Sequence, residues 1–116
     1  MEVNNVIIGA KLSEIQKKPD KVKLVFENNH TKKNYTLTFN GFLLETSDSV
    51  LNKRVKNIQF DNVLGFRVFA HLRDLNRNPQ NYTQMYIQME GSNEEKKREL
   101  LGAVRNYKIS SRKVAQ

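Results

Sequence analysis

Apolar and polar residues alternate along much of this chain, and short turn signals repeatedly interrupt the alternation. The pattern is clearest in KVKLVFEN (21–28) and in YTQMYIQME (82–90). A two-residue period is that of a strand with one buried face, and strands joined by short turns favour an antiparallel meander. The chain is therefore expected to fold mainly as an antiparallel sheet.

Several further segments carry the same signal. The turn ENNHTKKN joins residues 21–28 to the alternating stretch NYTLTFNGFLLE, which predicts a hairpin. RVKNIQF (54–60) and NVLGFRVFAHLR (62–73) are expected to be strands as well. Residues 1–18 fit either a helix or a strand, and the tight turn in KKPDK favours the strand.

The period changes after residue 90. Ser92 and Glu95 match a capping box, and the apolar residues from Leu100 to Tyr107 then recur at helical spacing. This predicts an amphipathic helix over about 92–107, followed by a loose basic tail at 110–116. The expected fold is thus α+β: an antiparallel sheet or partial barrel of five to six strands, covered by one C-terminal helix, in a single domain over residues 1–109.

Composition restricts the chemistry and the location of the protein. With 116 residues, six Phe and four Tyr, the chain is large enough to bury its own core. It has no cysteine, which excludes disulfides and thiolate metal sites and favours a reducing compartment. The first residues lack a basic leader and a long apolar run, so we expect a cytoplasmic protein with no signal peptide and no membrane span.

The charge of the chain points to the kind of partner. Twenty Lys and Arg against 12 Asp and Glu give a formal net charge of +8 and an isoelectric point near 9.8. Such an excess favours an anionic partner, either an acidic protein or a nucleic acid. The charge alone does not separate these two classes.

Enzyme motifs are missing from the sequence. It contains no Gly-rich phosphate loop, no GxSxG elbow and no HExxH zinc motif. Its two histidines, His30 and His71, have no second ligand at metal-binding spacing. We therefore expect a protein that is not an enzyme and needs no metal or cofactor.

The stretch GFRVFAHLR gives the first candidate binding surface. On a strand, Arg67, Phe69, His71 and Arg73 lie in one line on the wetter face. Neighbouring strands extend this line with Tyr86, or alternatively with Lys21 and Lys23. Aromatic rings beside arginines on a sheet are typical of proteins that bind single-stranded nucleic acid. Alternatively, this is a central strand buried on both faces, with its arginines reaching outward from the ends.

The expected C-terminal helix gives a second candidate, a basic patch. Its members are Lys96, Lys97, Arg98, Arg105 and Lys108. Such a patch can contact phosphates, but acidic residues interleave with the basic ones near its start. Mixed charge runs of this kind are more typical of a solvated helix face.

Residues 6–60 resemble a group of small β-rich bacterial domains. The resemblance rests on the order IIGAKLSEIQ, DKVKLVFEN, YTLTFNGF and VKNIQF. Many such domains are uncharacterised, and some resemble immunity proteins that neutralise a partner toxin. The resemblance implies protein binding without catalysis. Immunity proteins against nucleases tend to be acidic, whereas this chain is basic, so its partner would present an acidic surface.

Three functions follow from these observations. The first is a small non-catalytic binding protein, acting as an interaction, inhibitor or accessory module for an acidic partner. The second is a nucleic-acid-binding module that uses the basic and aromatic sheet face. The third is a small ligand-binding barrel with a cavity lined by Met85, Ile87 and Met89. An uncovered edge strand would also offer a route to a homodimer.

Overall fold

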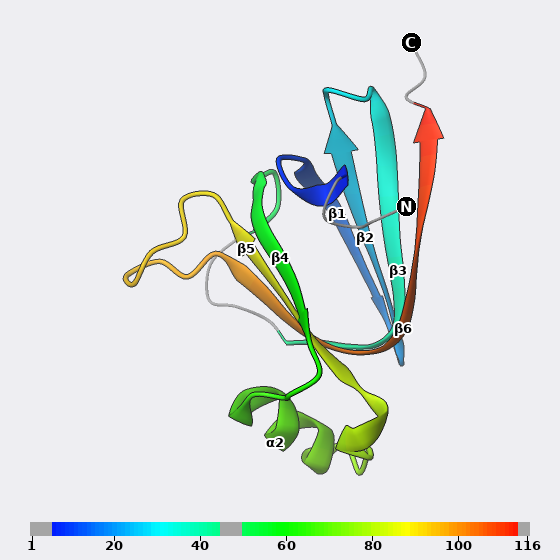
Figure 1. Ribbon diagram of the computed structural model, residues 1–116, viewed down its shortest axis with the longest axis vertical. Helices are drawn as coiled ribbons and strands as arrows, with labels where there is room; N and C mark the ends of the chain where they lie inside the picture. The colour runs from blue at the N-terminus through cyan, green and yellow to red at the C-terminus, as the bar shows by residue number, and fades with distance from the viewer. Residues whose placement is uncertain (1–5, 45–49, 114–116) are drawn as a thin grey trace.

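The computed structural model describes residues 6–44 and 50–113, and Figure 1 shows how they are arranged. In this part of the chain six strands form one antiparallel sheet in the order β1-β2-β3-β6-β5-β4. The strands are β1 (Lys11–Lys18), β2 (Lys21–Asn28), β3 (Lys33–Leu44), β4 (Val55–Asp61), β5 (Thr83–Met89) and β6 (Glu99–Lys113). Helix α2 (Phe66–Asp74) and a 3-10 turn, η1 (Pro79–Asn81), lie between β4 and β5.

The strands with the clearest alternation are where the sequence predicts them. β2 and β3 form the predicted hairpin in full register, from Lys21 opposite Asn40 to Asn28 opposite Lys33. β4 and β5 also match their predicted segments. The strand favoured for the first 18 residues is confirmed from Lys11 onward, whereas residues 6–9 form a helical turn.

β3 and β6 are long strands that bend together and divide the sheet into two arms (Figure 1). The pairing shifts at the bend: Asn40 lies opposite Asn106 and Gly41 opposite Val104, which leaves Arg105 as a bulge. Gly41 has a φ of +151°, and a Cβ added to it would lie 1.9 Å from the Ala103 carbonyl oxygen. Only glycine therefore fits where the two strands approach at the bend.

The main core fills the space between the two arms. The alternating apolar residues of all six strands meet there, and Phe26, Leu37 and Ile87 are completely buried. Phe60 of β4 and Tyr107 of β6 stack across the arms with ring centroids 4.7 Å apart. This stacking joins strands that are not neighbours in the sheet, so side-chain packing adds to the backbone pairing of β3 with β6 in holding the arms together.

The sheet is open, so the partial barrel expected from the sequence is wrong. Among the described residues, the edge of β1 meets the chain just before β4 through an isolated bridge between Lys11 and Arg54. Met85, Ile87 and Met89 are completely buried and pack in the main core. They do not line the cavity that a ligand-binding barrel requires.

The strand predicted at residues 62–73 is also wrong, because most of it forms α2. Val68 and Leu72, four residues apart, point the same way on a helix and are completely buried. They pack with Tyr82 and Ala103 in a second apolar cluster, on the outer side of the sheet from the main core. Figure 1 shows α2 beyond the bend, outside the space between the arms.

The C-terminal helix predicted at 92–107 is wrong as well, since β6 occupies residues 99–113. Before β6, the side chain of Asn93 accepts hydrogen bonds from the backbone of Glu95 and Lys96, and the Ser92 hydroxyl accepts one from Arg98. The residues that resemble a capping box thus shape the loop between β5 and β6. The predicted loose tail is part of β6 as far as Lys113, and residues 114–116 lie outside the described part.

One face of β3 changes character at the bend. Before it, the even-numbered residues such as Thr38 and Asn40 are polar and lie on the outer side of the sheet. Beyond it, Phe42 and Leu44 continue the same face and pack in the cluster beneath α2. Arg77 marks the boundary, because its guanidinium lies 5.5 Å from the centre of the Phe42 ring and 3.0 Å from Asp20 in the β1–β2 turn.

Candidate functional site

Helix α2 is attached to the sheet at its start and closed by a local backbone cap at its end. The backbone N–H of Gly65, just before the helix, donates to the Gln84 side chain on β5 over 2.6 Å. A Cβ on Gly65 would lie 3.1 Å from that same oxygen, so the small residue permits the close approach. At the other end the Arg77 N–H donates to the Leu72 carbonyl, and Asn76 takes the left-handed conformation that ends many helices.

The buried side of α2 determines which of its residues face the solvent. Val68 and Leu72 are buried against the sheet, and the His71 ring meets the edge of Phe42 with centroids 6.0 Å apart. With 3.6 residues per turn, this places Phe66 on the opposite side and Phe69 on the flank beside it. The orientation of the two phenylalanines therefore follows from the burial of the two aliphatic residues.

The outward side of α2 carries two exposed aromatic rings. Phe66 is 85% exposed and Phe69 is 41% exposed, and they lie three residues apart on one helix face. We refer to these two residues as the phenylalanine pair. Val63, in the loop before the helix, is 79% exposed. Large apolar side chains gathered on a surface in this way are a recognised mark of an interaction site.

Two arginines accompany the phenylalanine pair. Arg73 lies four residues after Phe69 and seven after Phe66, on the same side of the helix, and Arg67 lies on its flank. Both are exposed, and neither has an ion-pair partner among residues 6–44 and 50–113. The outward face of α2 thus combines apolar rings with positive charge.

The residues predicted to form one binding line are separated by the helix. Phe69 and Arg73 share the outward face and Arg67 flanks it, whereas His71 turns toward Phe42. Because the sequence favoured a strand, it placed Phe66 on the buried side, and the most exposed phenylalanine was missed. The spacing of Leu64, Val68 and Leu72, every fourth residue, was the signal that could have found it.

Tyr86 does not join the outward face of α2. It lies on β5, where its hydroxyl donates to the Glu99 carboxylate over 2.6 Å. Burial is the main reason that the pKa of Tyr86 is raised to about 12. The hydrogen bond to Glu99 and the charge of Glu99 act in the same direction but contribute less. Its hydroxyl is already bound within the sheet, so Tyr86 is better placed to stabilise the β5–β6 pair than to bind a ligand.

The residues predicted as one basic patch are also dispersed. Lys96, Lys97 and Arg98 lie in the loop between β5 and β6, and Arg105 is the bulged residue at the bend. Lys108 lies on the outer side of β6, directly opposite Thr38. It therefore belongs to a different surface, on the arm formed by β1, β2, β3 and β6.

Residues 6–44 and 50–113 hold no group of three or more His, Asp or Glu side chains arranged to bind a metal ion. In the same ranges no helix is long and apolar enough to cross a membrane. No protein-family model, curated protein or solved structure matches this chain.

Proposed function

We propose that this protein is a non-catalytic binding protein that docks an acidic protein partner through the outward face of α2. The observation that carries the proposal is the 85% exposure of Phe66 beside Phe69. Burying a phenylalanine side chain stabilises a complex by about 1.5–3 kcal/mol. Two neighbouring rings on a firmly anchored helix can therefore supply the centre of an interface.

The composition of this face favours a protein partner. Aromatic residues and arginine are enriched at the centres of protein–protein interfaces, and a few such residues supply most of the binding energy. The phenylalanine pair and Arg73 are of these types and lie on one side of one helix. Because α2 is fixed by Val68 and Leu72, little order has to be gained on binding.

The charge of this face favours an acidic partner. Arg67 and Arg73 add two positive charges around the rings, in a chain whose net charge is +8. A second copy of the chain would bring like charges together, so the charge argues against self-association at this face. A partner with an apolar pocket bordered by Asp and Glu would match both features. Inhibition of such a partner is the role implied by the resemblance to immunity-type domains.

The test is site-specific photo-crosslinking in cells of the source organism, with a photoreactive phenylalanine analogue at position 66. A second position, Phe69, and a control position, Leu51, also carry the analogue; both are 41% exposed, and Leu51 lies next to Asn52, which donates to Leu12 of β1. We expect position 66, and not position 51, to crosslink one acidic protein. The crosslinked protein is then purified and its affinity measured by calorimetry.

Variants of the helix face decide whether the crosslink reports a real interface. We expect Phe66→Ala and Phe69→Ala each to weaken binding about tenfold or more, and Arg73→Glu to weaken it most strongly at low salt. Leu51→Ala should leave the affinity unchanged. Equal crosslinking from positions 66 and 51, or an affinity that ignores Phe66→Ala, would show that the phenylalanine pair does not bind a partner.

A further inference from the structure

The arm made of β1, β2, β3 and β6 places four lysines close together on its outer side. The strand registers arrange the outer residues in rows that cross all four strands. One row consists of Lys18, Lys21, Asn40 and Asn106. The next row consists of Gln16, Lys23, Thr38 and Lys108. We call these two rows the lysine face. With strands about 4.8 Å apart and alternate residues about 6.8 Å apart, its four lysines are anchored within about 16 Å.

The positive charges of the lysine face outnumber the acids around it. The two rows contain no Asp or Glu. On the adjoining row Glu14 accepts a hydrogen bond from Gln16 of the lysine face, and one row further Glu27 is paired with Lys11 at 3.3 Å. In the nearby turn Asp20 is paired with Arg77. Within the described ranges, none of the four lysine ammonium groups has an ion-pair or hydrogen-bond partner.

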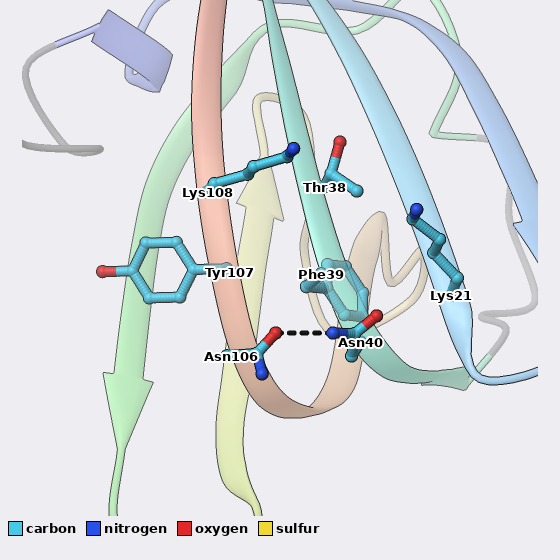
Figure 2. Close-up of a pocket in the computed structure, with 7 residues that line it drawn as sticks. All are labelled: Lys21, Thr38, Phe39, Asn40, Asn106, Tyr107 and Lys108. Atoms are coloured by element: carbon cyan, nitrogen blue, oxygen red, sulfur yellow. Dashed lines mark hydrogen bonds between the residues drawn. The ribbon is translucent and has the colours of Figure 1, made fainter.

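Between the lysines the surface is hollowed along β3. Figure 2 shows Lys21 of β2 and Lys108 of β6 on either side of β3, with Thr38 between them. Below them Asn40 donates a hydrogen bond to the Asn106 side chain over 2.7 Å. The hollow has a volume of about 350 Å³, and these five residues are among those that line it. Phe39 and Tyr107 complete the lining, so short polar side chains and two aromatic residues lie between the long basic ones.

We propose that the lysine face binds the phosphodiester backbone of a nucleic acid without reading its sequence. Phosphate oxygens accept hydrogen bonds from lysine, threonine and asparagine side chains, which are the groups gathered here. The lysines of β2 and β6 are separated by two strand spacings, about 9.6 Å, so a phosphate placed over β3 meets both sides. Counterions released from the backbone would drive the binding.

The composition of the lysine face favours phosphates over bases and over proteins. Neither row contains an aromatic side chain. Of the two rings beside the hollow, Phe39 is buried in the main core and Tyr107 already stacks on Phe60, so neither is placed to stack on a base. Lysine is depleted at protein interfaces, where arginine and aromatic residues are preferred. This surface therefore differs in kind from the outward face of α2, and the proposal does not depend on the function proposed above.

Fluorescence anisotropy with the full chain tests the proposal. The probes are labelled duplex DNA, duplex RNA and single-stranded DNA of mixed sequence, each titrated at three salt concentrations. We expect binding that is indifferent to sequence and weakens with salt, with a slope of log K against log salt of about −3.6 on duplex DNA for four phosphate contacts. Polyglutamate and anionic lipid vesicles serve as alternative anions and should bind at least tenfold more weakly.

Three variants locate the binding on the surface. Lys21→Gln combined with Lys108→Gln should weaken binding tenfold or more and reduce the slope by about 2. Asn106→Asp keeps the acceptor for the Asn40 hydrogen bond but adds a negative charge to the hollow, and should weaken binding about tenfold. Lys96→Gln combined with Lys97→Gln removes the same charge from the β5–β6 loop, and should change the affinity less than twofold.

These experiments test the lysine face separately from the docking face of α2. Phe66→Ala should leave nucleic-acid binding unchanged, which separates the lysine face from the docking face of α2. The proposal is overturned if no probe binds at low salt, or if the Lys96 and Lys97 variant weakens binding as much as the Lys21 and Lys108 variant. Stronger binding of polyglutamate or vesicles would also overturn it, because the site would then serve a different anion.

Discussion

The same face of β3 is covered by a helix at one end and left open at the other. Beyond the bend, Phe42 and Leu44 lie beneath α2. Before the bend, Thr38 and Asn40 lie between lysines, and no helix covers them in the described part of the chain. The backbone pairing is antiparallel in both regions, so the difference lies in the side chains alone.

This contrast shows how side chains decide which part of a sheet is covered. Phe42 and Leu44 lose unfavourable contact with water when α2 packs on them, and Val68 and Leu72 supply the matching surface. The lysines before the bend would lose their hydration if such a helix covered them, and nothing nearby offsets that cost. The apolar region beyond the bend is therefore covered by the chain's own helix. The lysine face before the bend stays open to an anion from outside.

The largest effect is expected at the bend that separates the two regions. We expect Gly41→Ala to destabilise the protein by about 4 kcal/mol, because backbone strain and overpacking each cost about 1–3 kcal/mol and its Cβ would meet the Ala103 carbonyl. Urea denaturation measures the change. Gly9→Ala is the control: Gly9 also has a positive φ, but its Cβ would have no neighbour within 4 Å, and we expect a loss of about 1 kcal/mol. Equal losses would show that the bend is not tightly packed.

The next effect concerns the helix that covers one region. We expect Leu72→Ala to destabilise the protein by about 3 kcal/mol, because it opens a cavity beneath α2 at a completely buried site. Phe66→Ser, on the exposed side of the same helix, should change the stability by no more than about 0.5 kcal/mol. Thermal and urea denaturation compare the two. Similar losses would mean that the phenylalanine pair supports the fold.

Removing a charge from the lysine face, in the open region, should stabilise the protein. Lys18 and Lys21 lie directly opposite each other on neighbouring strands, and like charges in that position repel. We expect Lys18→Gln to stabilise the protein by about 0.5 kcal/mol at low salt, and the gain to shrink as salt is added. Lys97→Gln, which removes the same charge from a loop, should show less of a gain. No stabilisation at low salt would indicate that the lysines do not repel one another.

The last effect is a pH dependence at Tyr86 of β5, which lies opposite Leu101 of β6. Its pKa is raised to about 12 in the folded protein, so the folded state holds this proton more tightly than the unfolded state does. Its contribution to stability is present below pH 10 and is lost as the pH rises toward 12. Denaturation across this range should show a shallower decline for Tyr86→Phe than for the natural protein.

Glu99→Gln tests the cause of that shift. It should lower the pKa of Tyr86 without returning it to the ordinary value, because burial is the larger cause and is unchanged. Absorbance titration of the tyrosines follows the change. A pKa that falls fully to its ordinary value would show that Glu99 alone is responsible.

The sequence predicted correctly the strands that have one face in the core and one polar face. β2 and β5 alternate cleanly because one face of each lies in the main core and the other is polar. In β6, residues 100–104 are apolar on both faces, since Leu100 and Val104 face the main core and Leu101 and Ala103 lie beneath α2. That crowding of apolar residues imitates a helical pattern, which explains the wrong prediction at 92–107.

The sites were harder to predict than the strands. GFRVFAHLR is too short for its period to be decisive, and its alternation hides the four-residue spacing that orients Phe66 outward. The lysine face depends on the pairing of β3 with β6, which brings Asn40 beside Asn106. No local pattern reports a contact between residues so far apart in the sequence, so Lys21 and Lys108 could not be connected in advance.

The position of β6 also has a consequence for how the protein folds as it is synthesised. β6 follows the other five strands in the chain, yet it lies between β3 and β5 in the sheet. Until β6 leaves the ribosome, the β1–β2–β3 and β4–β5 segments each expose an unpaired edge that can pair with another chain. Aggregation during synthesis is therefore governed by the interval between translation of β3 and translation of β6, and slow codons within that interval would lengthen the exposure.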